Sequence, residues 1–556
     1  MNGRAIRTPG GRELAVIGDE QLLTMDRLTS VFTHFDEDPR ICSVSLVAAP
    51  ASSAHEIWQR GAAPTGPVTL VAMDTQDLVG PMSGDEEEGL VEWCTRASER
   101  GLWHDWLLTY QPDVLRSADR TPMSELDERE GRDATSASSY RSVAGPQTIT
   151  GGLSLWVDIT WLGPHETGAQ VLATAALEAL ERQPGVDSIT LTGAEQLPSY
   201  AAHLIDLPGI DLHDDESPPP QADIAWYPNQ IDRRSNIAQA RIQGRRVVTT
   251  YLDLIAYDIP RYHASTDDWA AYRHLQRAIA LSVDGITTIS QDVANRLLLE
   301  VPQLDASRVT AISLGLDHIS SAPSDPDADV EHLRNRISAR PFVLVLGNDF
   351  VHKNRDFAIS VWERVLEAGV SCDLVLAGLH VRSSSSRDAE DRLLSQHTNL
   401  RGNVHTVGHV SSASRTWLMA NSAAVLYPSS AEGFGFVPYE AAALGTPSTF
   451  VRFGPLAELS GVSDAPSSWS VDELAADLIR LLTRENAAVN RVDELQRVQN
   501  TLTWDRFADQ LVDSFGETLA RPAVISASTP NEISEVRGSR PSRRLMGKAL
   551  RRLRQG

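Results

Sequence analysis

The stretch PSSAEGFGFVPYEAAALGTP, residues 428–447, decides the fold that we predict for this chain. It follows the short apolar run AAVLYPS, and a helical run begins near Pro438. Proline is tolerated near a helix start, because its missing N–H would have no partner there. The glycines let backbone N–H groups approach a ligand closely, and a helix N-terminus favours negative charge. The stretch therefore predicts a strand, a ligand-binding loop and a helix.

Two carboxylates flank this loop. Glu432 and Glu440 have seven residues between them, including Gly433 and Gly435. One carboxylate can face the hydroxyls of a sugar while the other reaches a ribose. The alternative interpretation is a glycine-rich turn with an incidental pair of glutamates.

Short apolar strands alternate with polar or helical segments on the N-terminal side of this loop. Such alternation predicts an α/β fold with two tandem doubly wound units of Rossmann type. Ligands of such sheets bind outside the carboxyl ends of the strands, so two facing units predict a cleft between their loops. The predicted strands lie at 153–162, 187–193, 222–228, 245–255, 285–291 and 308–315 in the first unit, and at 342–347, 372–378, 403–408 and 423–429 in the second.

Composition shifts divide the chain into segments. Residues 115–150 hold few large apolar side chains and predict a linker, and Pro323–Asp329 predicts a hinge because Pro and Asp favour a turn. The predicted domains are a smaller α/β domain at 1–114, the linker at 115–150, Rossmann-like halves at 151–325 (acceptor side) and 326–500 (donor side), a crossing helix at 501–520 and a basic tail at 521–556.

Charge and cysteine usage narrow the class of protein. The 556 residues carry a formal charge of −24, which argues against nucleic acid as a general partner. The 3 cysteines indicate neither a disulfide framework nor a zinc site and favour a reducing cytoplasm. No run of about 18 apolar residues is present. We therefore expect a cytoplasmic protein, with any membrane contact made from the surface.

Residues 152–520 resemble the retaining glycosyltransferases of family 4, which have the GT-B fold. The segment from Glu432 to Glu440 is similar to the family signature of two glutamates seven residues apart. Three further segments match in order and spacing: LVLGNDFVHKN at 344–354, the run into the signature at 405–429, and TWDRFADQLVDSF at 503–515, which is similar to the helix that crosses back to the first half.

The resemblance implies roles for individual residues. Lys353 would neutralise the departing diphosphate, Glu432 would hold the donor sugar, and Glu440 the ribose. Further donor-binding positions implied by the match are Gly168, Gly347, Asn354, Gly433, Phe434 and Gly435. The alternatives are an exposed lysine at a helix start and, at Gly168, a glycine that caps a strand-to-helix turn. Retention without a metal ion or another cofactor is implied.

Two positions depart from the family pattern. Leu252 stands where a histidine usually contacts the donor sugar, and Asp253, Tyr251 or His263 could replace it. Asp253 is the first choice for a catalytic role, and a helix or strand cap is its alternative. Asn348 stands where many relatives have an arginine, and His352 or Arg355 could compensate for that charge.

The two ends of the chain lie outside the segment that resembles the GT-B fold. Residues 13–115 resemble the latter half of a family 2 glycosyltransferase domain of GT-A fold, where Asp19, Glu20 and Glu92 could hold a divalent ion. A truncated, noncatalytic domain is the interpretation that we prefer. The tail at 537–556 is basic with leucines at helical spacing, which predicts either a helix on an anionic membrane or a disordered soluble tail.

The function predicted from sequence is transfer of a hexose, with mannose slightly favoured, from a nucleoside diphosphate sugar to a cell-envelope or surface glycan. The acceptor could be a lipid-linked saccharide, and the chain could form a homo-oligomer. Two alternatives stay open at this point. One is a noncatalytic assembly protein with a decayed site, and the other is a nucleotide-sugar epimerase of GT-B fold.

Overall fold

The computed structural model describes residues 5–7, 13–18, 31–32, 40–48, 57–61, 68–72, 90, 92–94, 96–97, 100, 103–109, 141–142, 151–192, 196–213, 221–232, 234–318, 328–337, 340–397 and 400–525. The predicted linker, apart from Arg141 and Ser142, and the tail beyond Ile525 lie outside these residues. The predicted hinge also lies outside them, except for Ala328 and Asp329, which belong to helix α10.

The first unit, residues 151–318, is a seven-stranded sheet in which every pairing is parallel. The strand order is β10-β9-β8-β11-β12-β13-β14. The strands are β8 (Leu153–Asp158), β9 (Val186–Thr192), β10 (Ile210–Leu212), β11 (Ala222–Tyr227), β12 (Gly244–Tyr251), β13 (Gly285–Thr288) and β14 (Val309–Ala311). The helices are α5 (Gly168–Glu181), α6 (Arg234–Gln243), α7 (Ile255–Asp258), α8 (Thr266–Ser282) and α9 (Gln291–Glu300).

The second unit, residues 328–499, is a five-stranded parallel sheet of order β17-β16-β15-β18-β19. The strands are β15 (Phe342–Leu346), β16 (Asp373–Ala377), β17 (Val404–Val407), β18 (Ala424–Tyr427) and β19 (Ser448–Phe450). The helices are α10 (Ala328–Ile337), α11 (Arg355–Glu367), α12 (Arg387–Gln396), α13 (Ser412–Asn421), α14 (Phe436–Ala443), α15 (Gly454–Leu459), α16 (Val471–Thr483) and α17 (Glu485–Gln499).

The apolar character of the strands explains why they lie in the interior of these parallel sheets. All five residues of β15 and of β16 are buried, as expected for parallel strands covered by helices on both faces. The predicted α/β fold with parallel sheets is confirmed. One boundary was wrong, because β8 ends at Asp158 rather than at residue 162. Helix α14 begins at Phe436, two residues before Pro438, near which its start was predicted.

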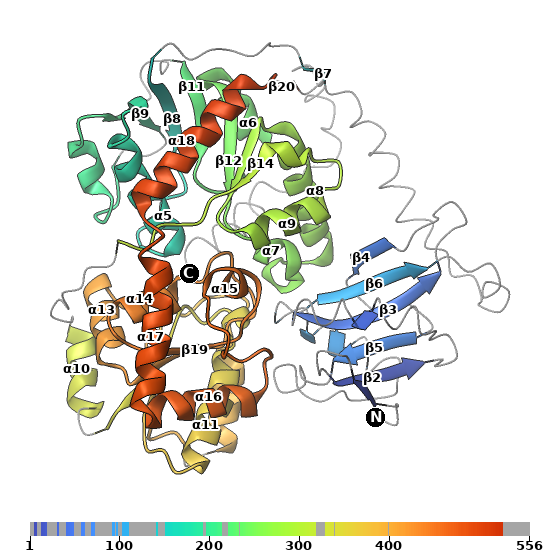
Figure 1. Cartoon of the computed structure of the whole chain (residues 1–556), viewed down its shortest axis with the longest axis vertical. Coiled ribbons are helices and arrows are strands. Elements are labelled where there is room, and N and C mark those ends of the chain that lie inside the picture. The colour runs from blue at the N-terminus through green and yellow to red at the C-terminus, as the bar shows by residue number, and fades with distance from the viewer. Residues whose placement is uncertain are drawn as a thin grey trace.

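Helix α18 (Trp504–Ala520) leaves the second unit and packs on the first, where it contacts α5, β12 and β13 (Figure 1). The hydroxyl of Thr503 caps its start by accepting from the N–H of Arg506. Leu511, Phe515 and Leu519 are buried at helical spacing, so one face of α18 joins the core. The helix thereby ties the two parallel-sheet units together.

The N-terminal unit, meaning the described residues between Ala5 and Thr109, lies beside both parallel-sheet units in Figure 1. It holds a mixed six-stranded sheet of order β1-β2-β5-β3-β6-β4, in which β3 and β6 are parallel and the other pairs antiparallel. Its strands are β1 (Ala5–Arg7), β2 (Glu13–Gly18), β3 (Ile41–Ala48), β4 (Ile57–Gly61), β5 (Val68–Ala72) and β6 (Trp103–Thr109). A two-stranded ribbon joins β7 (Arg141–Ser142) to β20 (Val524–Ile525).

The divalent-ion site considered for this unit cannot be traced among the described residues. Asp19 and Glu20 lie outside them, and Glu92 is exposed. Across the described part of the chain, no group of three His, Cys, Asp or Glu side chains is arranged to hold a metal ion. No helix in the described ranges has both the length and the hydropathy to cross a bilayer.

Candidate active site

The loop after β15 carries Lys353. Gly347 ends the strand with a φ of +143°, and Gly378 ends the neighbouring β16 with a φ of +147°. A Cβ on Gly378 would lie 2.1 Å from the carbonyl oxygen of Gly347, so only glycine allows the two strand ends to meet. The chain then makes a 3-10 turn, η8 (Val351–Lys353), and enters α11.

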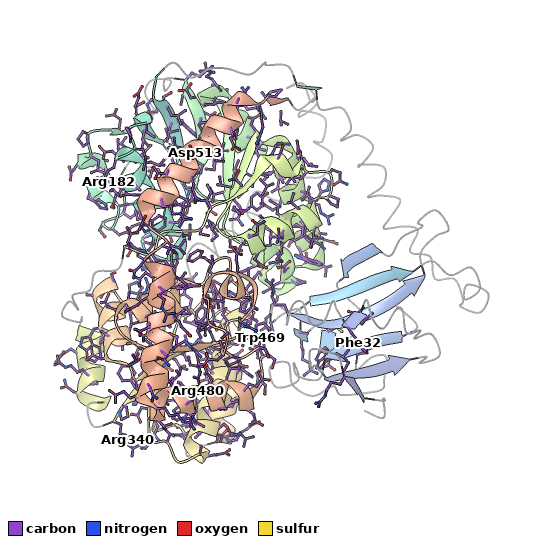
Figure 2. The ribbon with its side chains drawn as sticks, in the orientation of Figure 1. Phe32, Arg182, Arg340, Trp469, Arg480 and Asp513 are labelled. Carbon is purple, nitrogen blue, oxygen red and sulfur yellow. The ribbon has the colours of Figure 1, made fainter. Side chains whose placement is uncertain are left out.

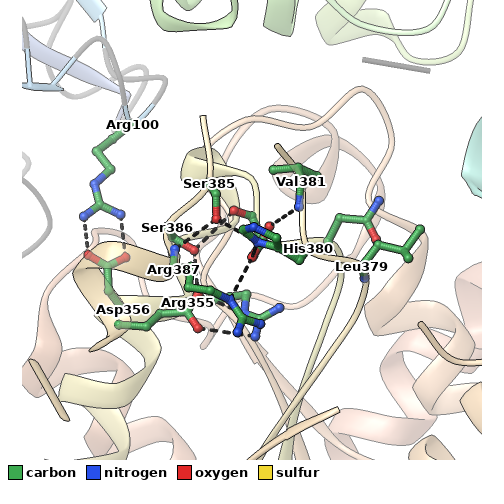
Figure 3. Close-up of polar contacts among 12 residues, drawn as sticks. Arg100, Arg355, Asp356, Leu379, His380, Val381, Ser385, Ser386 and Arg387 are labelled. Atoms are coloured by element: carbon green, nitrogen blue, oxygen red, sulfur yellow. Dashed lines mark hydrogen bonds and ion pairs between the residues drawn. The ribbon is translucent and has the colours of Figure 1, made fainter. Parts of the chain in front are cut away.

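Asp349 lies within this loop and bonds to His380 and Val381, two residues of the neighbouring loop that are labelled in Figure 3. It is fully buried, and its carboxylate accepts a hydrogen bond of 2.7 Å from the N–H of Val381. The imidazole Nδ1 of His380 lies 2.7 Å from the other carboxylate oxygen. These contacts hold the loop after β15 against the loop after β16.

The loop after β18 carries Glu432. Strands β15 and β18 are neighbours with Leu344 opposite Val425, so their carboxyl ends lie side by side. The indole N–H of Trp469, buried in the second unit and labelled in Figure 2, donates to the carbonyls of Pro428 and Ser429 at 3.1 and 3.2 Å. The loop after β18 is therefore anchored immediately before Glu432.

Lys353 and Glu432 meet at this edge. The Nζ of Lys353 lies 2.6 Å from Oε1 of Glu432, and the two side chains are 21% and 10% exposed. The same Nζ lies 5.6 Å from the centroid of the Tyr427 ring. Both charged groups are thus shielded but reachable, so the exposed lysine considered as an alternative is wrong.

The first unit closes on this pair through Gly433. A Cβ on Gly433 would lie 1.7 Å from the carbonyl oxygen of Leu252 and 3.2 Å from the Cβ of Asp253. The hydroxyl of Ser290 donates to the carbonyl of Gly433 at 2.8 Å. The absent side chain of Gly433 is what permits this approach.

Asp253 therefore stands beside Glu432. Burial and the nearby charge of Glu432 raise the pKa of Asp253 to about 6, although the N–H of Ile255 donates to its carboxylate at 2.8 Å. That hydrogen bond caps the turn that leads into α7, so Asp253 performs the capping role considered as its alternative while also facing the candidate site.

The other substitutes proposed for the missing histidine do not reach this place. Tyr251 is fully buried and its hydroxyl donates to the carbonyl of Gln276 at 3.0 Å. The Nε2 of His263 lies 2.8 Å from the carbonyl oxygen of Ala256. Of the three candidates, the structure brings only Asp253 next to Glu432.

The proposed compensation for Asn348 is also wrong. His352 is buried, its Nδ1 contacts the hydroxyl of Tyr262, and burial together with the charge of Lys353 holds its pKa well below its usual value. Arg355 is 1% exposed and is paired with Glu390. Neither supplies an accessible positive charge. Asn348 itself accepts from the N–H of Leu379 at 3.0 Å.

Glu440 faces protein partners. It is 2% exposed, contacts the guanidinium of Arg415, and has Oε1 3.5 Å from Nε2 of His318. Burial opposes its ionisation, yet Arg415 and His318 lower its pKa to about 2. The ribose role predicted for Glu440 would require a donor hydroxyl to join this ion pair.

The remaining predicted donor residues surround the same loops. Asn354 is fully buried in a left-handed conformation, and its amide donates to the carbonyl of Pro428 and the hydroxyl of Ser430, both at 3.0 Å. Phe434 is buried with its ring centroid 5.1 Å from that of Phe436. Gly435, with a φ of +85°, caps α14.

Gly168 is the first residue of α5 and faces the second unit. A Cβ there would make an ordinary contact, 3.4 Å, with the ring of Phe436. The N-termini of α5 and α14 therefore approach each other beside Gly433, and each favours a negatively charged ligand. The capping role considered as the alternative for Gly168 belongs to Thr167, which precedes it and forms the cap of α5 with Gln170.

Sequence reasoning missed the partners that organise this site. Arg415, His318, Ser290 and Trp469 each contact the loops described above. Arg415 and Trp469 come from the second unit, but His318 and Ser290 belong to the first. The serine before α9 is a recognisable helix cap, yet nothing in the local sequence predicts that it also bonds Gly433.

Parts of this chain are similar to known proteins. Residues 330–496 match the family model described as "Glycosyl transferases group 1", which supports the predicted glycosyltransferase class for that part of the chain. The chain is 22% identical over 284 residues to the O-antigen chain mannosyltransferase B of Escherichia coli, covering 49% of this chain and 70% of that protein. It is 24% identical over 262 residues to the MMP alpha-(1->4)-mannosyltransferase of Mycolicibacterium hassiacum, covering 46% of this chain and 59% of that protein. Among solved structures, Anabaena HepE in complex with UDP and glucose has a TM-score of 0.48 at 16% identity, covering 66% of this chain and 100% of that chain.

Proposed function

We propose that this chain is a retaining, metal-independent hexosyltransferase that uses a nucleoside diphosphate sugar as donor. The proposed acceptor is a cell-envelope or surface glycan, including a lipid-linked saccharide. Mannose is the favoured hexose, because both curated relatives described above are named mannosyltransferases. The match covers 59% of the length of the second relative.

The contact between Lys353 and Glu432 is the observation that carries the proposal. It joins a cation and a carboxylate at 2.6 Å at the carboxyl ends of two neighbouring parallel strands. Ligands of open α/β sheets bind at such strand ends. Asp253 from the first unit approaches the same place, so groups from both parallel-sheet units converge around one position.

Lys353 and Glu432 have separate roles in the proposed reaction. Lys353 neutralises the negative charge that develops on the diphosphate as the bond from its oxygen to the anomeric carbon breaks. Glu432 accepts hydrogen bonds from the donor sugar and orients it. The acceptor oxygen forms the new bond on the same face of the sugar, and its proton passes to the departing diphosphate. No metal ion takes part in these steps.

The lysine content of the chain allows a direct test. Lys353 and Lys548 are the only two lysines in the sequence. Acetylation of the full chain, read by peptide mass spectrometry, therefore reports on Lys353 with Lys548 as an internal reference. We expect a saturating nucleoside diphosphate sugar, GDP-mannose first, to slow acetylation of Lys353 by about tenfold or more, as a site more than 90% occupied requires. Acetylation of Lys548 should not change.

Variants connect this protection to the site. Glu432→Gln should weaken donor protection of Lys353, because a neutral amide binds sugar hydroxyls less strongly than a carboxylate. Lys353→Met should abolish transfer of radiolabelled hexose, and Arg182→Ala, which removes an exposed pair with Asp505, should not affect it. A chain that no GDP- or UDP-hexose protects at Lys353 would contradict the proposal and favour the assembly protein. Interconversion of free nucleotide sugars without an acceptor would favour the epimerase.

A further inference from the structure

Arg100 of the N-terminal unit reaches the start of α11, one turn beyond Lys353 (Figure 3). Its guanidinium makes a two-pronged contact with the carboxylate of Asp356, with Nη1 2.7 Å from Oδ1. The same Nη1 donates to Oδ1 of Asn354 at 3.1 Å. A planar guanidinium that meets a carboxylate with two parallel bonds fixes both position and orientation.

The backbone of Arg100 contacts the second site loop. Its carbonyl accepts from the hydroxyl of Ser430, which in turn accepts from the amide of Asn354. Ser430 lies two residues before Glu432, and Asn354 directly follows Lys353. Arg100 therefore bonds at once to the two loops whose charged residues form the candidate site.

The contact is shielded from water. The side chains of Arg100 and Asp356 are 18% and 12% exposed. Burial opposes ionisation of Asp356, but the charge of Arg100 outweighs it and lowers the pKa of that carboxyl. Asp356 is thus held as an anion that depends on Arg100 for its counter-charge, so losing Arg100 leaves a buried charge without that partner.

A second arginine of the N-terminal unit anchors it at the junction of the two parallel-sheet units. Arg40 is 2% exposed and makes two hydrogen bonds to Asp292 of α9, at 2.6 and 3.0 Å. Its guanidinium also lies 5.4 Å from the ring centroid of Phe453 in the second unit. The N-terminal unit is therefore docked on both units, and Arg40 and Arg100 precede the paired starts of β3 and β6, where Ile41 is opposite Trp103.

We propose that the N-terminal unit acts as a brace for the candidate active site, meaning that its docked surface restrains the loops after β15 and β18. Arg100 is the positioning residue that fixes the loop of Lys353 relative to the loop of Glu432. This inference rests on the proposed function for its effect on catalysis, but its structural part does not. In this role the N-terminal unit needs no active site of its own, because it acts through the surface that docks on the other two units.

Hydrogen exchange on the full-length chain tests the brace without any substrate. In Arg100→Ala, we expect the amides of residues 351–356 and 428–433 to exchange about tenfold faster, the ratio that about 1.4 kcal/mol produces. Arg100→Lys keeps the charge but cannot form two parallel bonds, so its loops should exchange at an intermediate rate. Arg182→Ala removes an exposed ion pair with Asp505 on the first unit and should change the exchange of the two loops less than about twofold.

Donor binding and transfer on the same variants separate this inference from the proposed function. We expect Arg100→Ala to weaken donor affinity about tenfold and to lower kcat, with partial recovery in Arg100→Lys, while exchange in β8 and β11 is unchanged. If the wild-type chain binds no nucleotide sugar but the two loops still loosen in Arg100→Ala, the proposed function fails and the brace stands.

The opposite result overturns the brace. Unchanged exchange of both loops in Arg100→Ala, with donor affinity as in wild type, would show that Arg100 does not position the two loops. Should Arg100→Ala fail to fold, Arg100→Lys decides alone, because wild-type exchange in that variant would equally refute a role for the two-pronged contact.

Discussion

Replacing Glu440 with glutamine should destabilise the second unit by about 3 kcal/mol at pH 7. The substitution keeps the shape of the side chain and removes its charge. In the folded chain the pKa of Glu440 is about 2, against an ordinary value of 4.5. That difference of about 2.5 pKa units corresponds to roughly 3 kcal/mol at about 1.4 kcal/mol per unit. Breaking a buried ion pair from one side typically costs a similar amount, about 3–5 kcal/mol.

The pH dependence has a definite sign. A carboxyl with a lowered folded pKa stabilises the protein above its unfolded pKa and loses that contribution as pH falls through the folded value. The stability gap between wild type and Glu440→Gln should therefore be complete at pH 7 and begin to shrink below pH 5. Urea unfolding at several pH values measures the gap, with hydrogen exchange in β18 and α14 reporting on the second unit alone.

The partner variant provides the control. Arg415→Met removes the guanidinium that contacts Glu440, and the double variant with Glu440→Gln should be more stable than the sum of the two single effects predicts. A Glu440→Gln chain as stable as wild type at pH 7, or a gap that stays constant between pH 7 and 4, would refute the assignment of Glu440 to a buried ion pair.

Two further predictions concern the first unit and its contact with the second. Because the folded pKa of Asp253 is raised to about 6, its ionisation weakens the fold as pH rises through 6, so Asp253→Asn should stabilise the chain by about 1–2 kcal/mol at pH 7, an amount reduced for the solvent that reaches this half-buried group. The same variant should lose any limb near pH 6 in the pH profile of hexose transfer; a limb that persists would assign it to another group. Gly433→Ala would place a Cβ 1.7 Å from the carbonyl of Leu252, so it should separate the loops and reduce transfer by about 100-fold. Gly408→Ala, where a Cβ meets nothing within 4 Å, is the matched control, and equal activities of the two variants would contradict the close approach at Gly433.

Local sequence was sufficient for the elements and for part of the candidate site. Apolar runs such as FVLVL at β15 and AVLY at β18 favour buried parallel strands, and glycines and prolines mark where they end. Lys353 and Glu432 follow two such strands, so their meeting at one sheet edge follows from the rule that ligands bind at strand carboxyl ends. The matched residues, 330–496, include both of these strands and both charged residues.

Local sequence did not identify the partners of the charged residues. Arg355 and His352 look accessible beside Lys353, but Glu390 and Tyr262 enclose them, and Glu440 is taken up by Arg415 and His318. Each pairing joins residues from different elements, so it depends on how those elements pack rather than on propensity.

The contact of Arg100 with Asp356 is the clearest case of a pairing that local sequence does not predict, because the two residues are 256 positions apart in the chain. Strand and helix formation depends on neighbours within a few residues, and the amino-acid sequence of this chain therefore determined its alternating elements and the place of its binding loop. An ion pair depends on two surfaces that meet after those elements have packed. Only the tertiary structure decided which cation each of these carboxylates meets, Arg100 for Asp356, Arg415 for Glu440 and Lys353 for Glu432.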